Sequence, residues 1–149
     1  MAAKRIHAKG PFQYEEYVNT VALLPGNLVE LDSDGAIQKH STAWGRAELM
    51  FVQENALIGN GVDTAIASGE VTPVIMPNIG SKVYALLADG ETVVVGDLLG
   101  SDGDGNLQKF DEDSAGTDDF CVAEAMEDKD LAADSLSTAQ LVLVRAHRN

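Results

Sequence analysis

The sequence predicts a mainly β protein: a small β-barrel or β-sandwich-like domain with duplicated hairpins and an extended N-terminal arm. Three observations lead to this fold class. Two related segments each have the pattern of a β-hairpin, turn residues recur about every ten residues, and short runs of Val, Ile and Leu lie between the turns. Regularly spaced short strands are typical of sandwiches and barrels. A chain of 149 residues has the size of one ordinary domain.

The internal repeat is the most informative of these features. Residues 26–40 align with residues 96–110 at a constant offset and without a gap. The identical positions are Gly26, Leu28, Asp32, Asp34, Gly35, Gln38 and Lys39, which recur as Gly96, Leu98, Asp102, Asp104, Gly105, Gln108 and Lys109. In each copy a short apolar strand leads to an Asp-Gly pair, whose glycine supplies the positive φ that a tight turn requires. Each copy therefore predicts a hairpin.

Further strands are expected at residues 71–76, 82–87, 92–95 and 141–144, which are rich in Val, Ile and Leu. Pro73 suggests that the first of them is an edge strand or carries a bulge, because proline cannot donate to a sheet. Residues 42–53 fit either a helix or a loop followed by a strand at 49–52, and we prefer the strand. Residues 130–139 fit a short helix or a polar loop equally well.

Charge divides the chain into an arm at residues 1–20 and a single mainly β domain at residues 21–149. The net charge is −14, yet residues 1–10 contain Lys4, Arg5, His7 and Lys9 and no acid. A basic arm on an acidic body is a polarity that a partner protein can read, although a disordered start with accidental charges has the same composition. The acidic body argues against nucleic acid and membrane surfaces as partners.

Neither a membrane span nor a signal peptide is expected from the hydropathy of the chain, so synthesis in a cytoplasm is the default expectation. The single cysteine, Cys121, excludes an internal disulfide framework.

No catalytic residue, cofactor site or metal site is predicted. The phosphate-binding and nucleophile-elbow motifs are absent, and the three histidines have no metal-ligand spacing. Asp102, Asp104 and Asn106 resemble the opening of a calcium loop, but Asp113 stands where such a loop has its glutamate. We therefore expect a protein without enzymatic activity, and a calcium- or carbohydrate-binding β module remains an alternative.

The order of motifs in the second half is similar to that of the capsid decoration, or cement, proteins of tailed-phage heads. The resemblance is carried by residues 95–99, by the turn at 101–105, by residues 120–124 and by the late strand at 140–145. It implies a compact β domain, often a homotrimer, on the outer capsid surface of the virion. There it would clamp neighbouring subunits of the major capsid protein. Another virion module, from the tail or baseplate, is the alternative within the same class.

The resemblance also implies that the N-terminal arm ties the domain to the shell. The candidate capsid contacts are Lys4, Arg5, Ile6, His7, Lys9, Phe12, Tyr14 and Tyr17. An arm of this kind binds by adding a strand to an exposed sheet edge while its aromatic side chains fill pockets. Alternatively, the three aromatic residues cover the end of the domain's own core. Deleting residues 2–10 is expected to abolish capsid binding and to leave the domain folded.

Overall fold

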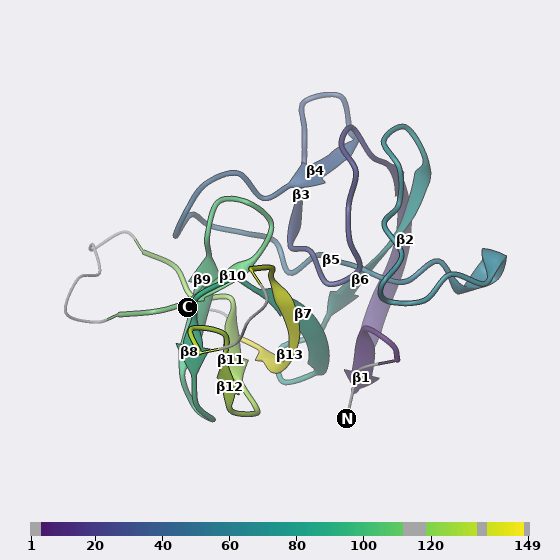
Figure 1. Cartoon of the computed structure of the whole chain (residues 1–149). Coiled ribbons are helices and arrows are strands. Elements are labelled where there is room, and N and C mark those ends of the chain that lie inside the picture. Colours follow the sequence, from purple (N-terminus) through teal and green to yellow (C-terminus); the bar gives the residue numbers. More distant parts are fainter. Residues whose placement is uncertain (1–3, 112–118, 134–136, 148–149) are drawn as a thin grey trace.

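A computed structural model describes residues 4–111, 119–133 and 137–147. These residues form a mainly β structure with a closed barrel and additional strands around it (Figure 1). The helical structure in this part of the chain is a single 3-10 turn, η1 (Ala56–Ile58). Among the residues described, no helix is long and apolar enough to span a bilayer. The predicted fold class is confirmed.

The barrel is built from five strands whose two ends pair with each other. Its strands are β7 (Lys82–Leu87), β10 (Leu107–Lys109), β9 (Leu98–Ser101), β11 (Ala123–Ala125) and β13 (Gln140–Ala146). They follow in that order, and β13 closes the barrel by pairing antiparallel with β7 along the whole of β7. Closure removes the free edges that an open sheet would expose.

Other strands surround the barrel. A short strand, β1 (His7–Lys9), pairs antiparallel with the start of β7. A three-stranded sheet has the order β2 (Phe12–Val18), β6 (Val71–Pro77) and β5 (Phe51–Val52). Two further pairs are β3 (Val29–Leu31) with β4 (Ile37–Lys39), and β8 (Thr92–Val93) with β12 (Lys129–Asp130). Both strands within the expected arm thus pair with strands of the expected domain.

The core consists of two apolar clusters that share β5 and β6. Successive side chains of a strand point to opposite faces. Phe51 and Ile75 therefore enter the barrel cluster, whereas Val52 and Val74 enter a second cluster beneath the β3–β4 hairpin. Because the same two strands line both clusters, the barrel and the hairpin region are packed on a common wall.

The two repeats form hairpins in the same register. Val29 pairs with Lys39 and Leu31 with Ile37, and the equivalent pairs in the second copy also form. In each turn the first aspartate holds the backbone: Asp32 Oδ1 accepts from two N–H groups at 2.9 and 3.0 Å, and Asp102 Oδ1 does so at 2.8 and 3.0 Å. Gly35 and Gly105 have φ of 81° and 76°, as predicted.

Two details of the secondary structure refine the expectations. The strand alternative at residues 49–52 is confirmed by β5. Pro73 lies in the central strand β6, so the edge-strand alternative is wrong. Its carbonyl accepts from Gln53 N–H at 2.9 Å, just beyond the last residue of β5. The N–H and the C=O of one strand residue point to the same neighbour, and because Pro73 has no N–H to return this bond, the pairing of β5 with β6 stops at Val52.

The segment at residues 130–139 begins at the end of β12, and Leu131 to Ala133 form bends. Ser137 to Ala139 contain no helical residue either, and residues 134–136 lie outside the described part of the chain, so the described residues of this segment follow the loop alternative.

Candidate functional site

The N-terminal segment lies against the barrel through a tight turn at Gly10 and Pro11. The Ser81 hydroxyl donates to the Pro11 carbonyl at 2.8 Å, and His7 Nε2 donates to the Gly10 carbonyl at 2.7 Å. Gly10 has a φ of 100°, and a Cβ there would lie 2.5 Å from the Ser81 hydroxyl oxygen. Only glycine fits this turn, which positions β1 and β2.

The position of Ile6 in the core does not fit its predicted role as a capsid contact. Its side chain is fully buried in the barrel cluster. Its N–H donates to a carboxylate oxygen of Glu54 at 3.0 Å, and its carbonyl accepts from Tyr84 N–H at 2.8 Å. Apolar burial and both hydrogen bonds hold Ile6 inside the domain, so in this conformation it has no surface to offer a partner.

The basic residues of the segment are on the surface. Lys4, Arg5 and Lys9 are exposed, and His7 is half-buried against the ring of Phe12 with centroids 4.3 Å apart. Ile6 is buried between the exposed Arg5 and the half-buried His7. The structure therefore keeps these four candidate contacts together at one end of the barrel.

The three aromatic candidates divide between the two expected roles. Tyr17 packs against the second core cluster, which fits the core-covering alternative. Phe12 and Tyr14 are 38% and 47% exposed on the opposite face of β2. The Tyr14 hydroxyl donates to the Glu16 carboxylate at 2.7 Å. Partial desolvation, together with this bond and the charge of Glu16, raises the pKa of Tyr14 to about 12.

β2 is also an edge strand. It pairs with β6 along its full seven residues, and no other strand of the described part pairs with it. An unpaired edge is a template on which another strand can add. The exposed side chains of Phe12 and Tyr14 belong to this edge strand. A third exposed apolar residue, Ile79 (66% exposed), is held near the start of β2, because the N–H of the preceding Asn78 donates to the Pro11 carbonyl.

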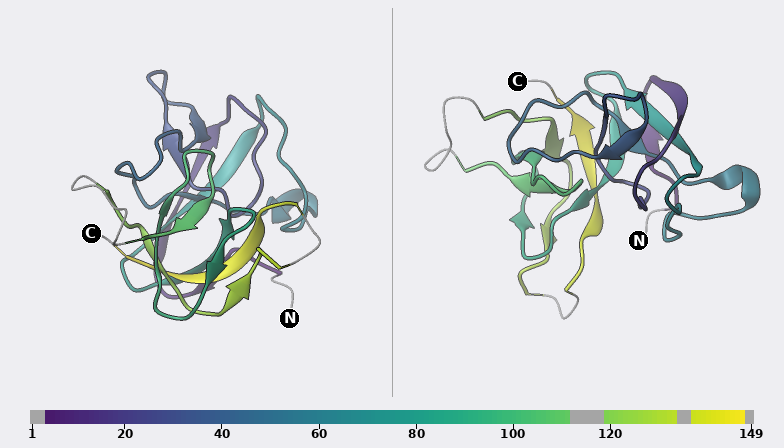
Figure 2. Two further views of the ribbon diagram at one scale, coloured as in Figure 1. Left: turned by 60° about the vertical axis from the view of Figure 1, so that its left-hand side comes forward. Right: turned by 90° about the horizontal axis from the view of Figure 1, so that it is seen from above.

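A second exposed apolar feature was not predicted from the sequence. The loop that carries η1 projects from the body (Figures 1 and 2), and Leu57 and Ile58 at its tip are 87% and 67% exposed. The sequence patterns gave residues 54–66 no element and no binding role. The uncharged run from Asn55 to Val62 between turn residues was the available indication that this tip is not held by the core.

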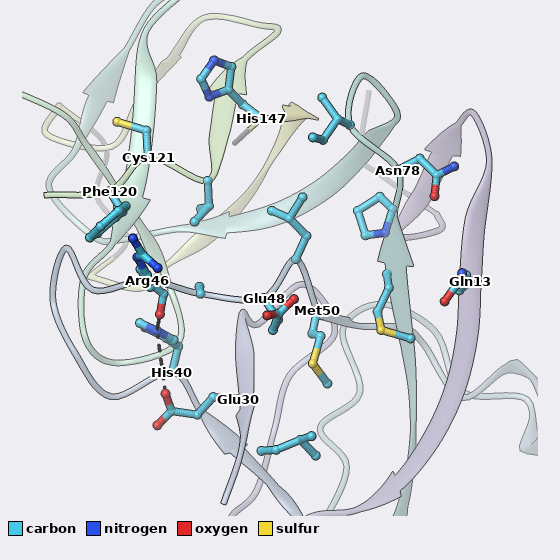
Figure 3. A pocket seen from close by; sticks show the side chains of 17 residues that line it. Gln13, Glu30, His40, Arg46, Glu48, Met50, Asn78, Phe120, Cys121 and His147 are labelled. Carbon is cyan, nitrogen blue, oxygen red and sulfur yellow. Dashed lines mark hydrogen bonds and ion pairs between the residues drawn. The ribbon is translucent and has the colours of Figure 1, made fainter. Parts of the chain in front are cut away.

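A hollow of about 930 Å³ is lined by β3, by the end of β6, by residues 46–50 and by the segment just before β11 (Figure 3). Its lining includes Met50, Met76 and Phe120, the last covered by the Arg46 guanidinium at 4.8 Å from the ring centroid. Burial, with a smaller effect of the nearby Asp119 charge, raises the pKa of the Cys121 thiol. A raised pKa keeps a thiol protonated and weakly nucleophilic.

His40 also lines this hollow, and both nitrogens of its ring form hydrogen bonds within the fold. Its Nε2 donates to the Arg46 carbonyl at 2.8 Å, so its Nδ1 accepts from the Ser101 hydroxyl at 2.6 Å. The Ser101 oxygen in turn accepts from Gly103 N–H at 3.1 Å. His40 thus joins the exit of the first hairpin to the start of the second turn, an arrangement in which every donor meets an acceptor.

The carboxylate of Asp102, considered above as a calcium ligand, is occupied by the hairpin itself. It accepts from Asp104 N–H, from Asn106 N–H and, at 3.3 Å, from the Asn106 side-chain amide. In the part of the chain that is described, no three His, Cys, Asp or Glu residues are grouped so as to hold a metal ion.

Comparison with known proteins gives a structural likeness only. The chain matches no family model and no curated protein sequence. Its fold is similar to that of the N base of head fiber gp8.5 of bacteriophage phi29. The TM-score is 0.56 at 15% sequence identity, and the match covers 92% of this chain and 95% of that chain. The fold therefore resembles that of a phage head fiber protein over nearly the whole length of both.

Proposed function

We propose that the chain is a phage capsid decoration protein that binds the outer surface of the head and stabilises contacts between major capsid subunits. The likeness over nearly the whole chain to a head fiber base is the observation that carries this proposal. An appendage domain seated on a head needs a rigid fold and binding surfaces, and it needs no reactive groups.

The surfaces at the N-terminal end support the same proposal. Three binding features follow one another along the first 18 residues. They are the basic residues in and before β1, the exposed side chains of Phe12 and Tyr14, and the free edge of β2. Strand addition gives affinity through backbone hydrogen bonds, while aromatic side chains supply the buried anchors of an interface.

The mechanism is stabilisation by binding. A ligand that binds only the assembled shell stabilises that shell by mass action. A homotrimer, the oligomer we propose, would present three such surfaces, and the second and third would bind at high effective concentration. No reaction takes part in this mechanism, and we propose that the protein is not an enzyme.

Co-sedimentation with purified heads of the phage that encodes the chain tests the proposal. We expect binding to expanded heads, many copies per particle, and a higher temperature of head disruption when the protein is bound. Tails purified from the same particles are the matched control. Binding to tails or baseplates but not to heads would overturn the proposal and favour the tail-module alternative.

A further inference from the structure

We propose that β1 and the adjoining ends of β7 and β13 form a cationic row that docks on carboxylates of the capsid partner. This inference rests on the proposed function and names the chemistry of the surface that the protein binds. Its central residue, Lys82, is not among the contacts expected from the sequence.

The register of three strands creates the row. Lys9 in β1 pairs with Lys82 in β7, and Lys82 pairs on its other side with Arg145 in β13. Lys82 and Arg145 pair directly in a regular register, so their side chains lie on the same face. The register of β1 on β7 shifts between His7 and Lys9, and Lys9, beyond this shift, is exposed. The next residue of β7, Val83, is fully buried, so the face that carries Lys82 is the outer one.

The charges of the row are only partly compensated within the chain. The Arg145 guanidinium binds the Glu124 carboxylate at 2.6 Å, in the strand beyond it. Among the described residues, Lys9 and Lys82 have no carboxylate within 4.0 Å, and neither do Lys4 and Arg5 just before β1. Like charges on paired residues destabilise a sheet. The chain has 24 carboxylates of its own, yet in the part that the structure describes Lys9 and Lys82 remain without one. An external anion would relieve the repulsion between them.

The rest of the molecule determines which anion fits. The net charge of −14 repels an extended polyanion such as DNA, which would continue past the row onto the acidic body. A few carboxylates on a protein surface can reach the row within the screening length of about 8 Å while the bodies stay apart. Exposed Phe12 and Ile79 beside the row supply the apolar contact that a protein interface needs.

Charge reversal tests the row, with Lys82→Glu and Lys9→Glu as the test variants and Lys129→Glu as the matched control. Like Lys82, Lys129 is half-buried in a strand and, among the residues described, has no carboxylate within 4.0 Å, but it belongs to the separate β8–β12 sheet. We expect each test variant to bind heads about tenfold more weakly and with a smaller salt dependence, and the control to bind as the unchanged protein does. Lys9 is exposed, so its variant remains informative if Lys82→Glu fails to fold.

The outcomes separate this inference from the proposed function. If the unchanged protein binds heads and both test variants bind equally well with the same salt dependence, the cationic row is wrong and the decoration role stands. If the unchanged protein does not bind heads, the row is tested with a short polyglutamate peptide. NMR shifts at Lys9 and Lys82 that vanish in the charge-reversal variants support the row, and their absence overturns it. Tighter binding of an oligothymidylate at the same residues would also overturn the assignment to protein carboxylates.

Discussion

At the scale of single residues, the junction between the hairpins depends on a few buried polar groups. Ser101 is fully buried and takes part in two hydrogen bonds at once, as donor to His40 and as acceptor from Gly103. A buried polar group that loses its partner has a large desolvation cost, whereas the same bond at the surface contributes little.

Ser101→Ala is therefore expected to lower the free energy of unfolding by about 1–3 kcal/mol. It leaves His40 Nδ1 and Gly103 N–H without a partner. Urea denaturation measures the change, and Ser68→Ala, which removes an exposed hydroxyl bonded to the Thr20 carbonyl, is the control. Equal midpoints for the two variants would contradict the structural role of Ser101.

The hydrogen bond between Tyr14 and Glu16 predicts a titration at high pH. The pKa of Tyr14 is raised to about 12 by partial desolvation and by the Glu16 carboxylate, so the folded protein favours the neutral phenol. A raised acid pKa stabilises the fold fully below the ordinary value of 10.0, and this contribution is lost as the pH rises through about 12.

Ultraviolet absorbance of the wild type minus that of Tyr14→Phe isolates this titration. We expect a midpoint near pH 12, which moves back toward 10.0 in Glu16→Gln because the carboxylate acceptor and its charge are gone. A midpoint at 10.0 in the unchanged protein would mean that the bond is not formed in solution.

At the scale of elements, the segment at residues 4–9 contains both candidate contacts and a part of the core. Its basic residues Lys4, Arg5 and Lys9 are exposed, but Ile6, directly before β1, is fully buried. Deletion of residues 2–10, expected from the sequence to leave the domain intact, would also remove Ile6 and its bond to Glu54. Loss of binding after this deletion would therefore not separate contact from folding, and substitutions of exposed lysines are the sharper test.

Ile6→Ala is expected to lower the free energy of unfolding by about 2–5 kcal/mol, through lost burial and the cavity that remains. Ile79→Ala is the matched control, because that side chain is 66% exposed and little burial is lost. Urea denaturation of both variants measures the difference. Two variants of equal stability would place Ile6 outside the core.

At the scale of the whole molecule, the barrel and the β3–β4 region should unfold together. β5 and β6 line both clusters, so a cavity in one weakens the wall of the other. Trp44 reports on the barrel side. Its backbone N–H donates to the Ser101 carbonyl, and its ring packs on Gly100 and edge-on to Phe110.

Val74→Ala, in the second cluster, is expected to lower the free energy of unfolding by about 2 kcal/mol. The shift should be the same when it is followed by Trp44 fluorescence and by circular dichroism, as in a two-state transition. Val71→Ala, at a position that is 54% exposed, should change neither probe. Separate transitions for the two probes would mean that the clusters fold independently.

Turn chemistry and short apolar runs were sufficient to predict most of the local structure. Both hairpins, β6, β7, β13 and the strand at β5 follow from signals that lie within a few residues of each strand. The aspartate and glycine of each repeat act on their own turn, so the sequence determines these elements without help from the rest of the chain.

Long-range pairing was decided by the tertiary structure alone. The closure of β13 on β7, the docking of β1 beside them, and the opposite roles of Ile6 and Arg5 depend on a register between segments far apart in the chain. A shift of one residue in such a register exchanges the buried and exposed faces of a strand. The alignment of Lys9, Lys82 and Arg145 has the same origin, because local patterns leave the partner of each strand open and packing around a common core selects it.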